Sequence, residues 1–276
     1  MPALKVIATP IGNIEEVSPR VKAALTKCEV LFCEDTRVTK KLLGLLGIDF
    51  SNKQFIINNE FKEKQNLSKV ANLIHQYHCG LVSDAGYPSV SDPGHILVEY
   101  VRTQLPQIAI EVINGPSALV CGLVTSGFPE SPLLFLGFLD HKPTQITQTL
   151  KHYQNFQGTI VLFEAVHRLQ QTLEVIQTVF SNTEVFVGRE LTKLHESHYW
   201  FNTSAPLPDI TLKGEFVIVI NNHHTQPVGQ YSDQLLKQEI TQLVQMGVKV
   251  KDACHYLAKR LQLKSNKLYT LFHESD

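Results

Sequence analysis

The chain has 276 residues, a length typical of two domains, and 43% of them are hydrophobic while 18% are charged. A formal net charge of −1 excludes a protein that binds nucleic acid through its overall charge, so local patches must supply any such binding. The five cysteines are scattered, odd in number and never arranged as Cys-x-x-Cys, which disfavours a zinc site and suits a reducing cytosol. The sequence has no signal-peptide pattern and no apolar run of membrane length, so we expect a cytoplasmic protein without a membrane anchor.

The first half of the chain alternates short apolar strands with amphipathic helices. Strands are predicted at residues 4–8, 30–33, 55–57, 81–83 and 109–113. Helices are predicted at residues 18–27, 36–46, 60–77 and 95–103, and a further helix is expected to follow Ser117 as its N-cap. This alternation predicts a first α/β domain, residues 1–127, with a mostly parallel sheet and helices on both faces.

A glycine and two prolines around residue 130 predict a boundary to a second α/β domain, residues 128–222. Strands are predicted at residues 133–138, 159–163, 184–188, 196–201 and 214–220, the last two as a strand pair, with helices ending near residues 156 and 180. Strands outweigh helices here, so we expect a mixed sheet. A polar linker at residues 221–229 and helices at 231–246, 249–263 and 265–272 predict a small helical module, residues 228–276.

Residues 81–94 join a short strand to a loop that twice reads Ser-Asp-x-Gly. Asp92 is the expected N-cap of the following helix, with Pro93 as its first residue. Ligands of open α/β sheets bind at the carboxyl ends of strands, which makes this loop a candidate ligand site. A purely structural connection is the alternative. Neither G-x-G-x-x-G nor G-x-x-x-x-G-K-[ST] occurs, which disfavours common Rossmann dehydrogenases and excludes P-loop NTPases.

Two groups of basic residues are candidates for binding RNA phosphates. Arg37, Lys40 and Lys41 fall on one face of a predicted helix. Residues 246–270 carry six basic residues and one acid, a net charge of +5. The six are Lys249, Lys251, Lys259, Arg260, Lys264 and Lys267. An ordinary solvated surface is the alternative for both groups.

Seven motifs in order resemble those of the tetrapyrrole methylase superfamily, and within it the bacterial enzymes that methylate a ribose 2′-oxygen of small-subunit ribosomal RNA. They are Ala-Thr-Pro-Ile-Gly-Asn, Cys-Glu-Asp-Thr-Arg, the doubled Ser-Asp-x-Gly loop, Gly-Pro-Ser-Ala, Phe-Glu-x-x-His-Arg, Gly-Arg-Glu-Leu-Thr-Lys and Gly-Glu-Phe-Val-Ile-Val. The resemblance implies a two-domain fold with S-adenosylmethionine in a cleft between the domains, plus the small helical module. It further implies 16S ribosomal RNA in the 30S subunit as the partner, with a decoding-centre cytidine as the target. A homodimer and the absence of a metal are also expected.

The resemblance assigns the cofactor to three loops. The residues are Thr9, Pro10, Gly12, Asn13, Ser83, Asp84, Ala85, Gly86, Pro88, Ser91, Asp92, Gly115, Pro116, Ser117 and Ala118. Three positions depart from the family pattern: Tyr87 stands where threonine is usual, Asn114 where proline is usual, and Ala165-Val166 replace a more polar pair.

Candidate catalytic residues follow two strands of the second domain. They are Glu164, His167, Arg168, Arg189 and Glu190. A ribose hydroxyl is a weak acid, so Glu164 or His167 is a candidate proton acceptor and Arg168 or Arg189 a phosphate clamp or oxyanion stabiliser. A helix cap or an ion pair with Glu164 is the alternative for His167 and Arg168, and an ion pair with Arg189 is the alternative for Glu190. At the level of function, a tetrapyrrole C-methyltransferase and a catalytically weak ribosome-binding protein remain alternatives.

Overall fold

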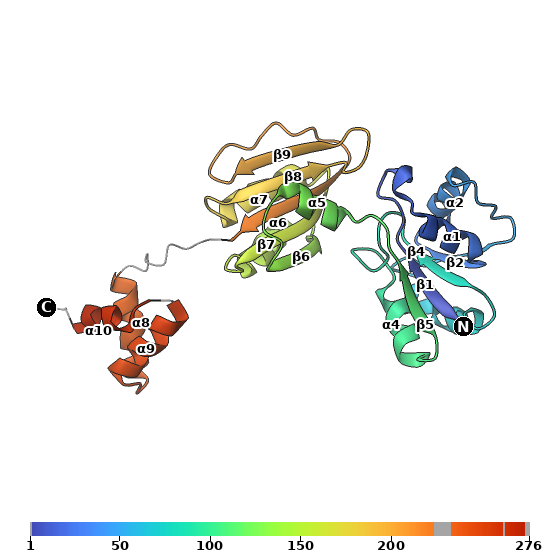
Figure 1. Ribbon diagram of the computed structural model, residues 1–276. Coiled ribbons are helices and arrows are strands. Elements are labelled where there is room, and N and C mark those ends of the chain that lie inside the picture. The colour runs from blue at the N-terminus through green and yellow to red at the C-terminus, as the bar shows by residue number, and fades with distance from the viewer. Residues whose placement is uncertain (1, 224–232, 262, 274–276) are drawn as a thin grey trace. The chain divides into compact units, whose positions relative to one another are not determined.

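The structure is a computed structural model that describes residues 2–223, 233–261 and 263–273. The chain divides into two compact units, Met1–His223 and His224–Asp276. The first unit holds two five-stranded sheets, and helices form the described part of the second (Figure 1). The predicted fold class, two α/β sheets followed by a helical module, is confirmed. Among the described helices, each is too short or too polar to span a bilayer.

The first sheet is entirely parallel, with the strand order β3-β2-β4-β1-β5. Its strands are β1 (Ala3–Ile7), β2 (Val30–Cys33), β3 (Gln54–Ile57), β4 (Cys79–Val82) and β5 (Ala109–Ile113). Each of β1, β2 and β4 is a nearly continuous apolar run, as expected for strands that are covered on both faces. From β1 the chain places β2 and β3 on one side, and it then returns so that β4 lies between β2 and β1 and β5 lies on the other side of β1. The loops after β1, β2 and β4 therefore meet at the carboxyl edge, where ligands of such sheets bind.

Two pairs of helices cover this sheet, one pair on each face. The short helix η1 (Ile14–Glu16) precedes α1 (Pro19–Lys27), and the others are α2 (Thr36–Leu45), α3 (Glu63–Leu73) and α4 (His95–Gln104). Apolar residues of α1 and α2 share one core, while those of α3 and α4 share the other. Ser18 caps α1, since its hydroxyl accepts the Val21 N–H.

One predicted helix start and one predicted N-cap were wrong, although α4 begins at residue 95 as predicted. The helix α3 begins at Glu63 instead of residue 60, after a turn. Gly94, not Asp92, precedes the first residue of α4, and its φ of 143° lies outside the range that other residues adopt easily. The chain turns at Gly94 before the helix begins, which frees the Asp92 carboxylate from a capping role.

The second sheet is mixed, as predicted, with the order β6-β7-β10-β8-β9. Its strands are β6 (Leu133–Phe138), β7 (Gly158–Ala165), β8 (Glu184–Arg189), β9 (Ser197–Asn202) and β10 (Glu215–Asn222). The prediction that the last two strands pair with each other was wrong, because β9 and β10 lie on opposite sides of β8. Residues 216–220 are buried without interruption, which suits a central strand, whereas β9 alternates and forms the edge.

Helices cover both faces of the second sheet as well. One core contains α6 (Pro143–His152) and α7 (Leu169–Val179), and α6 ends four residues earlier than predicted. The helix α5 (Ala118–Ser126) packs on the other face, against β7, β8 and β10. Ser117 is its N-cap, as predicted. The sequence-based boundary at residue 127 stays a prediction, and by its contacts α5 packs with the second sheet.

The second unit contains α8 (Asp233–Gln245), α9 (Val250–Leu261) and α10 (Ser265–His273). Buried apolar residues from all three helices, including Leu236, Leu257 and Leu268, form a separate core. Most of the predicted linker, together with the first predicted residues of α8, lies outside the described residues. The cysteines Cys28, Cys33, Cys79 and Cys254 are buried and Cys121 is half-buried, all as free thiols.

Two helical glycines provide a matched test of this packing. Replacing Gly122 in α5 by alanine puts the new Cβ 2.5 Å from Cγ1 of Val217 on β10, whereas nothing lies within 4 Å of the same atom at Gly44 in α2. Both changes gain about 0.5–1 kcal/mol of helix propensity, but overpacking costs about 1–3 kcal/mol. We expect Gly44→Ala to raise the free energy of unfolding in urea and Gly122→Ala to lower it. Equal effects at both sites would contradict the described contact between α5 and β10.

Candidate functional site

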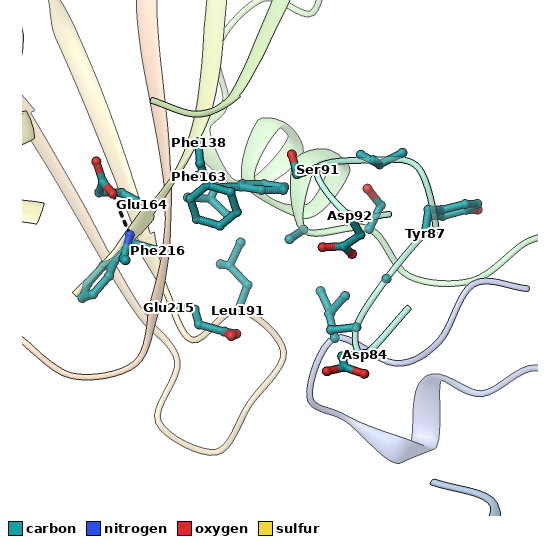
Figure 2. Close-up of a pocket in the computed structure, with 18 of the residues that line it drawn as sticks. Asp84, Tyr87, Ser91, Asp92, Phe138, Phe163, Glu164, Leu191, Glu215 and Phe216 are labelled. Carbon is teal, nitrogen blue, oxygen red and sulfur yellow. Dashed lines mark hydrogen bonds between the residues drawn. The ribbon is translucent and has the colours of Figure 1, made fainter. Parts of the chain in front are cut away.

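A cavity of about 380 Å³ lies where loops of the first sheet meet the second sheet. The first sheet and its loops contribute Ile11, Glu34, Asp84, Ala85, Gly86, Tyr87, Val90, Ser91 and Asp92, and the start of α5 adds Ser117 and Ala118. The second sheet contributes Phe138, Phe163, Glu164, Ala165, Glu190, Leu191, Lys193, Glu215, Phe216 and Val217. In Figure 2 the aromatic side chains of Phe138 and Phe163 and the Ser91 side chain lie in the upper part of the view, and Asp84 and Glu215 lie below them. The size is that of a small-molecule site.

Hydrogen bonds between loops fix the floor of the cavity. The Thr9 N–H donates to the Gly86 carbonyl over 2.8 Å, and the Gly86 N–H returns a bond of 3.1 Å. The buried Thr9 hydroxyl also donates to the Ser83 carbonyl. Tyr87, which departs from the family pattern, has a structural contact here: its hydroxyl accepts the Gly115 N–H from the loop after β5. Three loops are therefore held together before any ligand binds.

Three carboxyl groups from the first sheet line the cavity: Glu34, Asp84 and Asp92. Glu34 accepts the Asp84 N–H, and Asp84 accepts the Asp35 N–H, so these acids stay close together. Burial, reinforced by the Glu34 carboxylate, raises the pKa of Asp84 to about 6. The same two causes raise the pKa of Asp92 to about 7. This side of the cavity therefore favours a positively charged ligand group.

Lys193 is the cationic side chain among the lining residues, and it is already paired. Its Nζ lies 2.8 Å from Oε1 of Glu190 and 2.8 Å from Oε2 of Glu215. Although burial opposes the ionised forms, these contacts raise the pKa of Lys193, and they help to lower the pKa of Glu190. The charge of the lysine is shared by two acids of the second sheet, and the acids of the first sheet have no cationic partner among the lining residues.

Glu164 lines the cavity, but other groups occupy its carboxylate. Oε1 accepts the Ala165 N–H and lies 2.9 Å from Nη2 of Arg168, while Oε2 accepts the Thr172 hydroxyl over 2.5 Å. Both side chains of the ion pair are buried. In Figure 2 the carboxylate points away from the centre of the pocket. The ion pair that the sequence left as an alternative is present, and a proton acceptor would need a freer carboxylate.

The other candidate catalytic side chains of the second sheet also either bond groups within the protein or lie outside the cavity. Arg189 is buried and donates to the carbonyls of Lys213 and His195, so its guanidinium serves the backbone. Arg168 donates to the Leu139 carbonyl. His167 is exposed and does not line the cavity. Their assigned catalytic roles stay predictions that this geometry does not favour.

The predicted cofactor residues divide into two groups. Asp84, Ala85, Gly86, Ser91, Asp92, Ser117 and Ala118 line the cavity. Thr9, Pro10, Gly12, Asn13, Ser83, Pro88, Gly115 and Pro116 do not, although hydrogen bonds or packing place several of them directly behind the lining. Gly12 lies against the Lys193 side chain, and Asn13 caps η1.

Sequence reasoning missed several lining residues. Glu34, Phe163, Leu191, Lys193 and Glu215 lie inside the quoted motifs, which was a usable signal. Phe138 carried none, because an apolar residue near the end of a strand looks like ordinary core.

All nine basic residues predicted to bind RNA are exposed. Arg37 pairs with Asp35 over 2.6 Å, and Lys40 lies 5.0 Å from the centroid of the Phe55 ring. In the second unit Arg260 pairs with Glu239. Within the described ranges, no three His, Cys, Asp or Glu side chains are grouped so that they could hold a metal ion.

Comparisons with known proteins agree with the fold and add relatives. The family model described as tetrapyrrole (corrin/porphyrin) methylases matches residues 3–205. The chain is 62% identical to a Mycoplasma genitalium protein named ribosomal RNA small subunit methyltransferase I, and the match covers 100% of both. Proteins of the same name from Synechocystis and Halalkalibacterium halodurans are 35% and 31% identical, over 98% of this chain and 97% and 94% of theirs.

Solved structures with the same fold are more distant in sequence. The methyltransferase CobJ matches with a TM-score of 0.59 at 17% identity, covering 83% of this chain and 98% of its own. Uroporphyrin-III-C-methyltransferase from Thermus thermophilus matches with a TM-score of 0.54 at 15% identity, covering 81% and 96%. At these identities the likeness describes the fold alone.

The buried pair of Glu164 and Arg168 yields a stability prediction. Replacing Glu164 by glutamine leaves the Arg168 charge buried without its partner, which typically costs about 3–5 kcal/mol. We expect a loss of that order in the free energy of unfolding. Arg37→Met, which removes one partner of the exposed Arg37–Asp35 pair, is the control and should change stability little. A Glu164→Gln protein as stable as the parent would contradict a structural role for this pair.

Proposed function

The chain belongs to the tetrapyrrole (corrin/porphyrin) methylase family, and we propose that it transfers a methyl group from S-adenosylmethionine to a ribose 2′-hydroxyl of 16S ribosomal RNA in the 30S subunit. The observation that carries the proposal is full-length similarity to proteins named as small-subunit ribosomal RNA methyltransferases. They match 98–100% of this chain at 31–62% identity, and this similarity favours an RNA substrate over a tetrapyrrole.

The cavity fits S-adenosylmethionine in both size and charge. Glu34, Asp84 and Asp92 suit a ligand that carries a sulfonium and an ammonium group, and Ser117 offers a hydroxyl at the start of α5. We propose that the loops after β1, β4 and β5 hold the cofactor, as the family resemblance implies. When bound, the cofactor supplies an electrophilic methyl group on a good leaving group. Positioning therefore supplies much of the rate enhancement.

We place the proton acceptor among the cavity carboxylates instead of at Glu164. A useful general base has a pKa near the working pH and lies within reach of the reacting hydroxyl. Asp92 and Asp84 line the cavity, and their pKa values of about 7 and 6 suit this task. Glu164, with both oxygens bonded inside the protein, would instead hold Arg168 and the end of β7 in position.

The second unit is the proposed RNA contact. Its six candidate basic side chains are exposed, and their positive charge contrasts with the acidic cavity. Tyr256 and Tyr269 on α9 and α10 are about half exposed, so aromatic faces accompany the charges. A cytoplasmic homodimer completes the proposal, on the family resemblance alone.

The direct test is transfer of a labelled methyl group from S-adenosylmethionine to purified 30S subunits. We expect incorporation into 16S ribosomal RNA that resists alkaline hydrolysis at one ribose, because a 2′-methoxy group cannot attack its neighbouring phosphate. Label in a tetrapyrrole such as uroporphyrinogen III and none in RNA would favour the C-methyltransferase. Label in neither substrate would favour a ribosome-binding protein.

The raised pKa of Asp92 predicts pH-dependent cofactor binding. The cationic ligand favours the carboxylate form, so protonation below pH 7 must weaken binding, by up to about tenfold from pH 8 to pH 6 for one carboxyl. Calorimetric affinities at both pH values measure the effect. Asp92→Asn should bind more weakly at pH 8 and show a flatter profile, and S-adenosylhomocysteine, which lacks the sulfonium charge, should respond less. The same slope in parent and variant would remove Asp92 from the cofactor site.

The second unit has its own core, so a chain that ends at Pro227 should keep the first unit folded. Each lost phosphate contact reduces the salt dependence of RNA affinity through counterion release. We expect the shortened chain to bind S-adenosylmethionine normally, and to bind 30S subunits more weakly with a smaller salt slope. An unchanged affinity and slope would make the second unit a structural appendage.

A further inference from the structure

A second cavity of about 460 Å³ adjoins the first. It is lined by Glu60 before α3, by Ser91, and by residues 135–138 of β6. Ser91 and Phe138 line both cavities, so the two are neighbours on either side of these residues. A group held in the second cavity therefore lies next to the proposed methyl donor.

The shared wall is aromatic and already ordered. The Phe163 ring packs edge-on against both Phe135 and Phe138, with ring centroids 5.0 and 5.7 Å apart. Phe138 nevertheless remains 52% exposed. An exposed ring that is buttressed by a second ring offers a flat apolar face, and nucleobases stack on such faces.

The edge strand β6 is shaped to form this wall. Its register against β7 shifts between Phe135 and Gly137, and Gly137 has a φ of 62°. A Cβ on Gly137 would lie 3.0 Å from the Ser91 hydroxyl, so the bulge brings β6 close to the cofactor loop. Strand bulges often redirect a side chain next to an active site, and here the redirected residues surround Phe138.

The charge of the second cavity identifies the part of RNA that it suits. Its lining has one ionisable residue, Glu60, and no cation, which disfavours a phosphate. A carboxylate instead accepts hydrogen bonds from the exocyclic amine of cytosine or adenine. An enzyme that acts on a nucleotide in structured RNA must also move it out of its stack.

We propose that the second cavity receives the base of the target nucleotide, which stacks on Phe138 and donates its exocyclic amine to Glu60. This proposal rests on the proposed function and specifies its substrate: an unstacked nucleotide with an amino-bearing base, cytosine for the expected target. The ribose then lies beside Ser91 and Phe138, the residues that line both cavities, and faces the methyl donor.

Variants of Phe138 test the stacking. Phe138→Leu removes the aromatic face, and Phe138→Tyr keeps it. Leu133→Ala, on the same strand but outside both cavities, is the matched control. We expect kcat/KM for 30S subunits to fall about 5- to 150-fold in Phe138→Leu, the range of base–aromatic stacking, and to stay near the parent value in the other two. Because Phe138 also lines the first cavity, calorimetry with S-adenosylmethionine measures any accompanying loss of cofactor affinity, which should be smaller than the loss in kcat/KM.

Glu60→Ala tests the base contact. We expect the parent enzyme to prefer subunits with the target cytidine over subunits with uridine there, and the variant to lose at least about fivefold of that preference.

An unchanged kcat/KM in Phe138→Leu, or a loss explained by weaker cofactor binding, overturns the stacking. An unchanged preference in Glu60→Ala overturns the base contact. A parent protein that methylates no 30S subunit overturns the proposed function itself, and this proposal with it.

Discussion

The contact of Lys193 with both sheets organises the site. Its side-chain carbons lie so close to Gly12 that a Cβ there would be 2.3 Å from Cγ, and its ammonium group bonds Glu190 and Glu215. The loop after β1 is thereby held against the loop after β8. Any larger residue at position 12 would displace the Lys193 side chain and would be strained at a φ of 145°. The cavity depends on this contact because its lining comes from both sheets.

The same lysine divides the cavity electrostatically. Its single positive charge is shared by two acids of the second sheet, whereas Glu34, Asp84 and Asp92 of the first sheet have no cationic partner among the lining residues. The aromatic wall of Phe138 and Phe163 belongs to the second sheet. The proposed ligands, a cationic methyl donor and a neutral base, therefore suit different walls of the site. The proposed phosphate contacts fall to exposed basic residues elsewhere, including lysines of the second unit.

The sequence predicted the alternating elements well, because buried parallel strands such as β1 and β4 are continuous apolar runs. It failed where tertiary contacts decide. The pairing of β10 with β7 and β8 joins segments far apart in the chain, and no local pattern records that choice. Asp92 looked like a helix cap, but the positive φ of Gly94 moves the start of α4 past it. Sequence motifs located several of the polar loop residues that line the cavity. They did not show that the Glu164 carboxylate is buried, because its partners Arg168 and Thr172 reach its two oxygens only in the folded chain.

Ribose-methylation mapping of 16S ribosomal RNA tests the central claim most directly. The RNA would come from cells that lack this chain, and from the same cells supplied with the parent or with Asp92→Asn. The account predicts that one ribose methyl group disappears with the chain, returns fully with the parent and returns poorly with the variant. A complete set of ribose methyl groups in the cells that lack the chain would contradict it.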